Sequence, residues 1–284
     1  MELVWLQSLL IIAEEKSLSR ASQKLNISQP ALSKQIKKLE HMLNSELLNR
    51  SPQGVELTKS GERTLDYAKK VLSEWKKLQS DLALLQAEHI VQIGSLPSLA
   101  SQYLPLKLLH FPLQQHIQVE DNSQKLMAKL LEGDIDIAFV ELQQDYPNTY
   151  QKPLFSEPLF LIVSANHIFA NRDQVTFADV IDQPFLLYPM GCDSRYFVNR
   201  MFAKLNKKPR IAHETPYGQS ILGYVRAGRG ITVLPYSAIK DLKQEEIKAI
   251  PINENEAIRT IFIVSTQKEL LEQFTNHIKE VRPT

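Results

Sequence analysis

One predicted helix of this chain, from Ser28 to Met42, carries a row of polar side chains that can donate hydrogen bonds. The row consists of Gln29, Ser33, Lys34, Lys37 and Lys38. Glutamine can pair with adenine through two hydrogen bonds, serine can bond to either base type, and Pro30 can contact a thymine methyl group. Lysines suit phosphate groups, which fix the register of a protein on a duplex. The chemistry available to this face is therefore recognition of double-stranded DNA.

A polar helix face is, for an arbitrary helix, more often solvated than bound to a ligand. The local charge favours binding here. Between positions 16 and 63 the chain has nine basic and four acidic residues, although its net charge is only +1. Counterion release supplies much of the affinity of proteins for DNA, so a local basic patch favours phosphate contact.

Three short helices are predicted to hold this face in place. Apolar residues at three- and four-residue steps predict the first helix, and they are Leu3, Leu6, Leu9, Leu10 and Ala13. Ser17 or Ser19 can cap a second helix that ends near Asn26, a residue type that tolerates a left-handed turn. Ser28 can cap the third helix, whose predicted inward stripe is Ala31, Leu32, Ile36, Leu39 and Leu43. Only about three residues separate the second and third helices, which predicts a helix-turn-helix.

A hairpin is predicted behind this recognition helix. Two short apolar runs flank a Pro-x-Gly turn between Glu46 and Thr58, a pattern typical of a β-hairpin. A hairpin in this position is a wing, and its Arg50 can approach the DNA backbone or the minor groove. The predicted DNA-contacting residues are thus Ser28, Gln29, Pro30, Ser33, Lys34, Lys37, Lys38 and Arg50.

A long helix is predicted next, because no proline occurs from Thr58 to about Glu88. Its apolar stripe consists of Leu65, Ala68, Leu72, Trp75 and Leu82, widened by Val71, Leu78 and Leu85. A helix of about 28 residues is about 42 Å long, and such a stripe is most simply buried against a second copy. The alternative is packing against the C-terminal part of the same chain. A dimer also suits the DNA domain, since one recognition helix reads only a half-site.

The rest of the chain alternates predicted strands and helices, which indicates a parallel sheet covered by helices. Two successive α/β units predict a two-lobed domain. The predicted strands are 90–95, 117–120, 135–140, 159–163, 185–188, 211–214, 231–234 and 261–264. Ligands of open α/β sheets bind beyond the carboxyl ends of strands, near helix N-termini. The candidate ligand-binding residues are therefore Ser95, Ser98, Val140, Met190, Arg195, Thr215 and Gly218.

These candidates suit a small anionic ligand. The helix start at Tyr217-Gly218-Gln219 presents free amides, and Arg195 can form a charge-assisted pair with a carboxylate. The alternative is that the serines only cap helices and that Arg195 lies on the surface.

Several classes of protein are excluded by what the sequence lacks. Cys192 is the only cysteine, so no intrachain disulfide can form, and a structural role is favoured over a redox role. No nucleophile elbow, phosphate loop, dinucleotide fingerprint or metal-spaced histidine pair occurs, so we expect no enzyme activity, cofactor or metal. Glu2 precedes the apolar stretch Leu3–Ala13, where a signal peptide has a basic start. No window approaches the roughly 18 apolar residues of a membrane span. We expect a cytoplasmic protein rather than a membrane protein or an exported solute-binding protein.

The sequence resembles the LysR-type transcriptional regulators. In the first 61 residues the resemblance rests on Ser17-Leu18-Ser19-Arg20-Ala21-Ser22, Leu25, Ser28-Gln29-Pro30-Ala31-Leu32-Ser33, Ile36, Leu39-Glu40, Arg50, Gly54-Val55, Leu57-Thr58 and Gly61. Further along it rests on Gly133-Asp134-Ile135-Asp136-Ile137-Ala138 and on the string from Val225 to Pro235. Two residues depart from the family pattern. Leu48 stands where the family usually has an aromatic residue, and Gln53 stands where it often has arginine, which removes a charge from the wing tip.

The resemblance implies a fold with three parts. They are an all-α winged helix-turn-helix domain over residues 1–58, a linker and dimerisation helix over 59–88, and a two-lobed α/β effector domain over 89–284 that resembles periplasmic binding proteins. Lobe I is expected at about 89–163 and 265–284, and lobe II at about 164–264. The crossings are expected near Val163–Ser164 and Val264–Ser265, with the last helix, Lys268 to Val281, in lobe I.

The resemblance also implies function and partners. We expect a sequence-specific transcription regulator that binds promoter DNA and senses a small-molecule effector. It is expected to form a homodimer or a dimer of dimers, to contact RNA polymerase and to act at the nucleoid.

Overall fold

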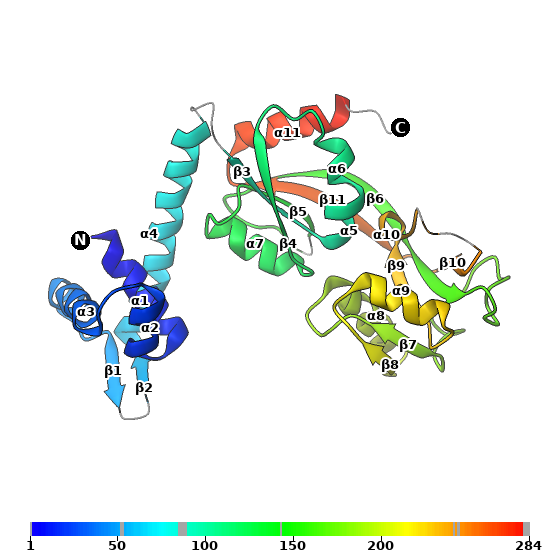
Figure 1. Ribbon diagram of the computed structural model, residues 1–284, viewed down its shortest axis with the longest axis horizontal. Helices are drawn as coiled ribbons and strands as arrows, with labels where there is room; N and C mark the ends of the chain where they lie inside the picture. Colours follow the sequence, from blue (N-terminus) through cyan, green and yellow to red (C-terminus); the bar gives the residue numbers. More distant parts are fainter. Residues whose placement is uncertain are drawn as a thin grey trace. The chain divides into compact units, whose positions relative to one another are not determined.

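The computed structural model describes residues 2–51, 54–84, 90–142, 144–240, 242 and 245–280. The chain divides into two compact units, one made of residues 1–87 with 131–134 and one made of the remaining residues. The first unit is mostly blue and cyan in Figure 1, and the second unit runs from green to red. Within the described residues, no helix is long and apolar enough to cross a membrane.

The N-terminal unit consists of three short helices, a two-stranded hairpin and a long helix (Figure 1). Its elements are α1 (Leu3–Glu15), α2 (Leu18–Lys24), α3 (Gln29–Leu43), β1 (Leu48–Ser51), β2 (Gly54–Leu57) and α4 (Lys59–Leu84). The two strands are antiparallel, with Arg50 opposite Val55. This arrangement confirms the predicted winged helix-turn-helix, with the hairpin as its wing.

Local hydrogen bonds and turn residues set the limits of α3. The Ser28 hydroxyl accepts a hydrogen bond from the amide of Ala31 at 3.3 Å, which satisfies an amide that the first helical turn leaves without a partner. Before it, Asn26 has a φ of 54°, and after it, Asn44 has a φ of 47°. Both are in the left-handed conformation that asparagine tolerates. These short-range preferences explain the tight turn between α2 and α3.

The core of this unit is formed by the facing sides of its helices. The residues that are completely buried in it include Leu9, Leu32, Ile36 and Leu39. Two members of the predicted inward stripe of α3 lie outside this core, because they stand at the helix ends. Ala31 is exposed in the first turn, and Leu43, the last residue of α3, is 43% exposed.

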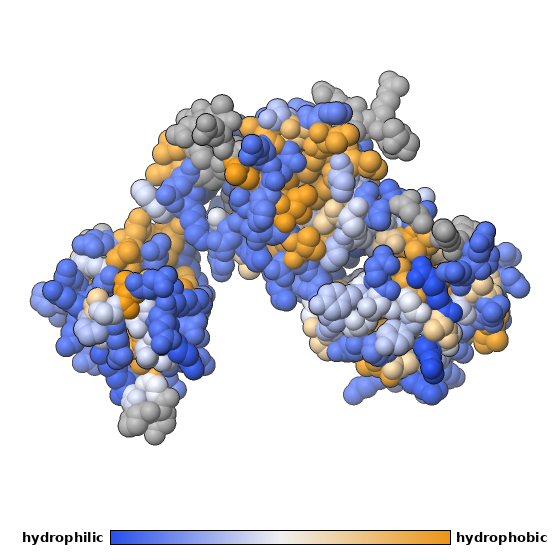
Figure 2. Space-filling view, viewed as in Figure 1, coloured by the Kyte–Doolittle hydropathy of each residue, from blue (hydrophilic) through white to orange (hydrophobic). Residues whose placement is uncertain are grey.

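The long helix α4 has two apolar faces rather than one stripe. Ala68 and Leu72 are buried in the core of the unit. A second row is exposed and consists of Tyr67, Val71, Trp75, Leu78 and Leu82. Leu85 of the predicted stripe lies outside the described residues. Because the exposed row keeps three- and four-residue steps, its side chains share one side of the helix, and Figure 2 shows apolar surface along α4 in orange.

The second unit is built on a seven-stranded mixed sheet with the order β10-β6-β11-β5-β3-β4, and β9 pairs with β6. Its strands are β3 (Ile90–Ser95), β4 (Gln114–Val119), β5 (Ile137–Glu141), β6 (Tyr150–Ser164), β9 (Thr232–Pro235), β10 (Ile247–Pro251) and β11 (Ile258–Ser265). A separate pair is formed by β7 (Pro184–Leu187) and β8 (Arg210–Glu214). The helices are α5 (Pro97–Gln102), α6 (Leu104–Lys107), α7 (Ser123–Leu131), α8 (Asp193–Lys204), α9 (Gly218–Arg226), α10 (Tyr236–Ile239) and α11 (Lys268–Glu280).

The sheet is parallel only in part, which corrects the prediction of a parallel sheet. Strand β3 is parallel to β4 and β5, but β11 is antiparallel to β5 and β6. Strands β9 and β10 are also antiparallel to β6. The physical reason is that β6 leads the chain out of one group of strands and β11 brings it back, so the two strands run in opposite directions.

The pairing of β6 changes partner along its length. Residues up to Pro158 pair with β11, and residues from Leu159 pair with β9 or β10. Val163 is buried in the same cluster as Phe185 and Phe202, beyond the change of partner. The strand pairing therefore changes near Pro158 of β6 and at the start of β11, and the crossings expected near Val163–Ser164 and Val264–Ser265 stay predictions. Lobe I here denotes β3–β5, β11 and the first part of β6 with α5–α7 and α11, and lobe II denotes the rest of this unit.

Candidate functional site

The predicted recognition residues share one accessible side of the N-terminal unit. The exposed members are Gln29, Pro30, Lys34, Lys37 and Lys38, with Ser33 half-buried among them. The ammonium group of Lys38 lies 5.4 Å from the centre of the Trp5 ring, a contact that favours one position of the side chain. The face can therefore present amide, hydroxyl and ammonium donors to a groove.

The wing is fixed to α3 by the carboxylate of Glu40, for which the sequence predicted no structural role. Glu40 accepts hydrogen bonds through Oε1 from the amides of Leu47 at 2.9 Å and Leu48 at 3.3 Å. Leu48 is 6% exposed, so it packs in the core where the family pattern has an aromatic ring. Arg50 is exposed on β1. Gln53, the predicted wing-tip residue, lies outside the described residues.

A cavity of about 340 Å³ lies between the lobes of the second unit. Ser98 and Gly218, two of the predicted ligand residues, both line it. A neighbouring cavity of about 230 Å³ is lined by two more, Met190 and Arg195. The structure thus brings four of the seven predicted residues to two adjoining hollows at the lobe boundary.

The other three predicted ligand residues line neither cavity. Ser95 and Val140 are completely buried, and the Ser95 hydroxyl donates to the carbonyl of Leu96 at 3.1 Å. Thr215 is 8% exposed, and its hydroxyl accepts from the amide of Tyr217 at 3.4 Å. The two hydroxyls bond within the turns after their strands, and the Val140 side chain belongs to the core.

Arg195 is buried rather than on the surface, and the chain supplies acceptors for part of its guanidinium, while its predicted role towards a ligand carboxylate stays a prediction. The side chain is 5% exposed. Its guanidinium donates to the Asn199 amide oxygen at 3.1 Å and to the Tyr188 carbonyl at 3.2 Å. It also pairs with Glu214 at 3.3 Å.

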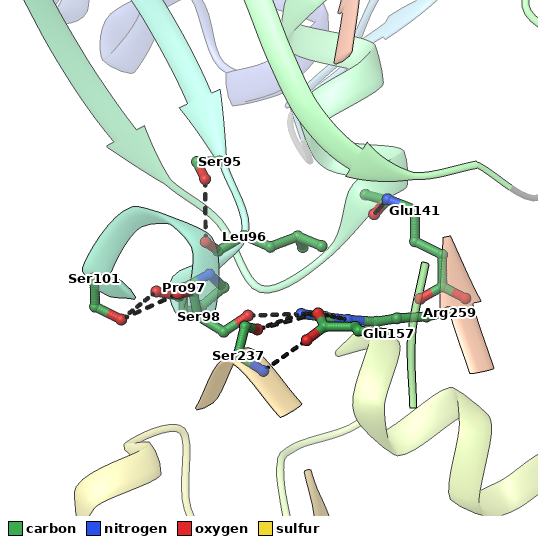
Figure 3. Close-up of polar contacts among 10 residues, drawn as sticks. Ser95, Leu96, Pro97, Ser98, Ser101, Glu141, Glu157, Ser237 and Arg259 are labelled. Carbon is green, nitrogen blue, oxygen red and sulfur yellow. Dashed lines mark hydrogen bonds and ion pairs between the residues drawn. The ribbon is translucent and has the colours of Figure 1, made fainter. Parts of the chain in front are cut away.

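A buried ion pair at the lobe crossing is the main polar feature that sequence reasoning missed. Arg259 of β11 stands opposite Glu157 of β6 in the sheet, and the two side chains, 7% and 4% exposed, pair at 2.6 Å. Arg259 Nη2 also donates to the hydroxyls of Ser98 at 2.8 Å and Ser237 at 3.1 Å. Figure 3 shows the two serines meeting at this pair. One serine comes from α5 of lobe I and the other from α10 of lobe II.

The charges around the cavities are mostly negative. The larger cavity is lined by Asp121, Asp193 and Arg259, and Arg259 is already neutralised by Glu157. The smaller cavity is lined by Glu141, Asp193 and Arg195, and Arg195 is paired with Glu214. Burial raises the pKa of the Glu141 and Asp193 carboxyl groups above the ordinary range, because the charged form loses hydration.

Cys192 also lines the larger cavity. It is 5% exposed, and burial raises the pKa of its thiol. Since the thiolate is the nucleophile in cysteine chemistry, this site favours the unreactive form. Among the described residues, no group of three or more His, Cys, Asp or Glu side chains is placed to hold a metal ion.

These features define a class of protein: a winged helix-turn-helix joined through a long helix to a two-lobed binding domain. Two family models cover nearly the whole chain. The bacterial regulatory helix-turn-helix protein of the lysR family matches residues 3–62, and the LysR substrate binding domain matches residues 86–282. The chain belongs to the LysR family of transcriptional regulators, and its second unit is an effector-binding domain.

Individual relatives agree with this assignment. The chain is 31% identical over 279 residues to the HTH-type transcriptional regulator BenM of Acinetobacter baylyi, covering 95% of this chain and 91% of BenM. It is 30% identical over 267 residues to the DNA-binding transcriptional dual regulator OxyR of Escherichia coli, covering 91% and 87%. A solved full-length OxyR from Pseudomonas aeruginosa aligns with a TM-score of 0.66 at 26% identity, covering 98% of this chain and 95% of the other.

Proposed function

We propose that α3 reads operator DNA through Gln29, Pro30 and Ser33, while Lys34, Lys37 and Lys38 contact phosphates. The observation that carries this proposal is the shared exposure of these side chains on one side of a capped helix. Short side chains near the N-terminus of the helix suit base edges, and lysines suit the backbone. Arg50 on the wing adds a backbone or minor-groove contact beside the main site.

The division of roles is tested by binding measurements on an operator selected from random DNA. Gln29→Ala is expected to relax preference at one base position, at a cost of about 1–3 kcal/mol. Lys34→Ala is expected to weaken binding to every sequence and to reduce the salt slope by about 1. Lys207→Ala, an exposed lysine of the second unit, serves as the control. Identical effects of Gln29→Ala and Lys34→Ala would reject the proposed roles.

The exposed apolar row of α4, from Tyr67 to Leu82, supports a homodimer. A homodimer places two recognition helices on the two halves of an operator. A dimer of dimers and a contact with RNA polymerase extend this proposal to the assembly that acts at a promoter. Because its target is chromosomal DNA, the nucleoid in the cytoplasm is the proposed place of action. No catalytic step is part of the proposal, since the relatives reported above are transcription regulators.

The cavity of about 340 Å³ is the proposed effector site. The Ser98 hydroxyl and the first amides of α9 at Gly218 are its proposed hydrogen-bonding groups. The charges do not support the anionic ligand suggested by the sequence, because two carboxylates line this cavity and its one arginine is paired. Each helix N-terminus adds only about half a positive charge. We therefore propose a small polar effector without net negative charge.

Effector action then follows from different affinities for two lobe arrangements, the only source of energy available to a bound ligand. A thermal-shift screen of the full chain with metabolites in matched acid, amide and amine forms tests the ligand class, because a ligand of the native state raises apparent stability. Stabilisation by acids alone would reject the proposed class. If none of the stabilising compounds altered the DNA footprint of the protein on its operator, the proposed control of DNA binding by an effector would be rejected.

Thiol oxidation is a second candidate, because Cys192 lines the cavity and some relatives are named hydrogen peroxide-inducible genes activators. Burial and the raised pKa of the thiol favour the small-molecule proposal over this one. A Cys192→Ser variant separates the two. Loss of the transcriptional response in this variant, with operator binding intact, would favour oxidation.

A further inference from the structure

The first turns of α7 in lobe I and α8 in lobe II meet directly. The Asp193 carboxylate of α8 accepts hydrogen bonds through Oδ2 from the Ser123 amide at 3.0 Å and the Ser123 hydroxyl at 2.5 Å. Both donors belong to the first residue of α7. A carboxylate at a helix start satisfies an amide and interacts favourably with the helix dipole. One lobe therefore supplies a carboxylate to a helix of the other.

The contact is reciprocal. The amide of Asp193 donates to the carbonyl of Asp121 at 3.1 Å, and the side-chain amide of Asn122 donates to the carbonyl of Gly191. The Ser123 hydroxyl in turn accepts from the amide of Glu141 at 3.0 Å, which ties this contact to β5. Two short segments from different lobes are thus joined by several hydrogen bonds, and the charged acceptor is Asp193.

Asp193 also lines both cavities. We propose that Asp193 and Ser123 form a latch that holds the lobes together across the cleft when no effector is present. The regulatory meaning of the latch rests on the effector function proposed above. In this arrangement the carboxylate of the chain itself holds the closed state, and a ligand enters through the fraction of molecules in which the latch is open. The apparent affinity for a ligand is reduced by that fraction.

The latch makes a prediction that needs neither DNA nor effector. Hydrogen–deuterium exchange of the full chain is followed in peptides that cover 121–124 and 191–194. Asp193→Ala is expected to speed exchange in these peptides at least tenfold, a factor that corresponds to about 1.4 kcal/mol in the free energy of opening. Exchange in the strands β3 and β5 is expected to stay unchanged, because the lobes themselves remain folded. Asp173→Ala removes an exposed carboxylate of the same lobe and is expected to change neither peptide.

A second variant keeps the test decisive if Asp193→Ala disturbs the start of α8. Ser123→Ala removes one donor from the other side, and it also removes the acceptor of the Glu141 amide. The comparison is therefore made in the peptide over 191–194, where the double variant is expected to exchange no faster than Asp193→Ala, because there both substitutions act on one contact. Unchanged exchange at 121–124 in both single variants would overturn the latch. Additive effects of the two substitutions at 191–194 would also overturn it. Since no ligand is used, the latch can fail while the effector proposal stands, and the ligand screen can fail while the latch stands.

Discussion

Replacing Arg259 by alanine is expected to destabilise the effector domain strongly, because it breaks a buried ion pair at the lobe crossing. Glu157, 4% exposed, keeps as hydrogen-bond donors, within the part of the chain that the structure describes, the amide of Ser237 at 2.6 Å and its hydroxyl at 3.1 Å. The bonds from Arg259 to Ser98, Ser237 and Glu157 are lost together. Leaving one member of a buried pair without its partner typically costs about 3–5 kcal/mol.

That free energy converts into a thermal shift that calorimetry can resolve. For a domain of this size each kcal/mol lowers Tm by about 2–4 °C, so the expected decrease is about 6–20 °C. Calorimetry of the full chain measures it on the transition of the effector domain. Arg229→Ala removes an exposed arginine of the same domain, and its expected effect is within about 0.5 kcal/mol.

A double substitution tests the cause. Arg259→Met with Glu157→Leu removes both charges and keeps most of the volume, so it is expected to recover most of the lost stability, as replacement of buried pairs by apolar residues often does. A decrease below about 2 °C for Arg259→Ala would refute the reasoning, since it is less than the shift expected for one kcal/mol. A double variant no more stable than the single one would show that the serine contacts, not the buried charge, dominate.

Three further predictions concern other parts of the chain. Gly61→Ala is expected to destabilise the N-terminal unit by about 1–3 kcal/mol in thermal unfolding, because a Cβ there would stand 2.1 Å from the carbonyl oxygen of Leu47; an unchanged Tm contradicts the close approach. Leu78→Glu places a charge in the exposed row of α4 and is expected to shift the sedimentation of the chain from dimer towards monomer. A dimer that stays stable would count against this row as the dimer interface. Glu141→Gln is expected to stabilise the chain more at pH 7 than at about pH 4, since burial raises the pKa of Glu141. Above the ordinary carboxyl pKa of about 4, the native state then binds more protons than the unfolded state. The free energy of unfolding of the unsubstituted chain therefore falls as pH rises through the raised pKa. An equal gain in stability from Glu141→Gln at both pH values would exclude a raised pKa of Glu141.

The features that the sequence predicted well are local ones. Ser28, Asn26 and the apolar steps of α3 act within a few residues of themselves, so their types indicate the cap, the turn and the buried face directly. The limits of that reasoning lie at helix ends, as the exposure of Leu43 shows. On α4 the three- and four-residue steps identified apolar residues of the helix. One helix can have two apolar faces, however, and the sequence pattern does not say which residues enter the core of the unit and which stay exposed.

The ligand-binding residues were harder to predict because they depend on side-chain direction and long-range pairing. The rule for carboxyl ends of strands finds backbone positions, and Ser98 and Gly218 do line the cavity. Val140 stands one residue before Glu141, which lines the smaller cavity. The side chain of Val140 is completely buried and faces the core instead. The pair of Glu157 with Arg259 joins residues about a hundred positions apart through antiparallel register, which no local pattern reveals. Arg259, the one charged residue of β11, was a signal for a buried pair but did not identify its partner.

The two charged contacts at the lobe boundary have different places in the fold and are therefore expected to have different roles. Arg259 and Glu157 stand opposite each other on the two strands that cross between lobes, so they can stay paired while the lobes change their angle. Asp193 and Ser123 stand on helices of opposite lobes, so any opening of the cleft must separate them. Substitution of Arg259 is thus expected to act on the stability of the whole effector domain, and substitution of Asp193 on the opening of the cleft. An effector that shifts the lobes has to compete with the second contact and can leave the first intact.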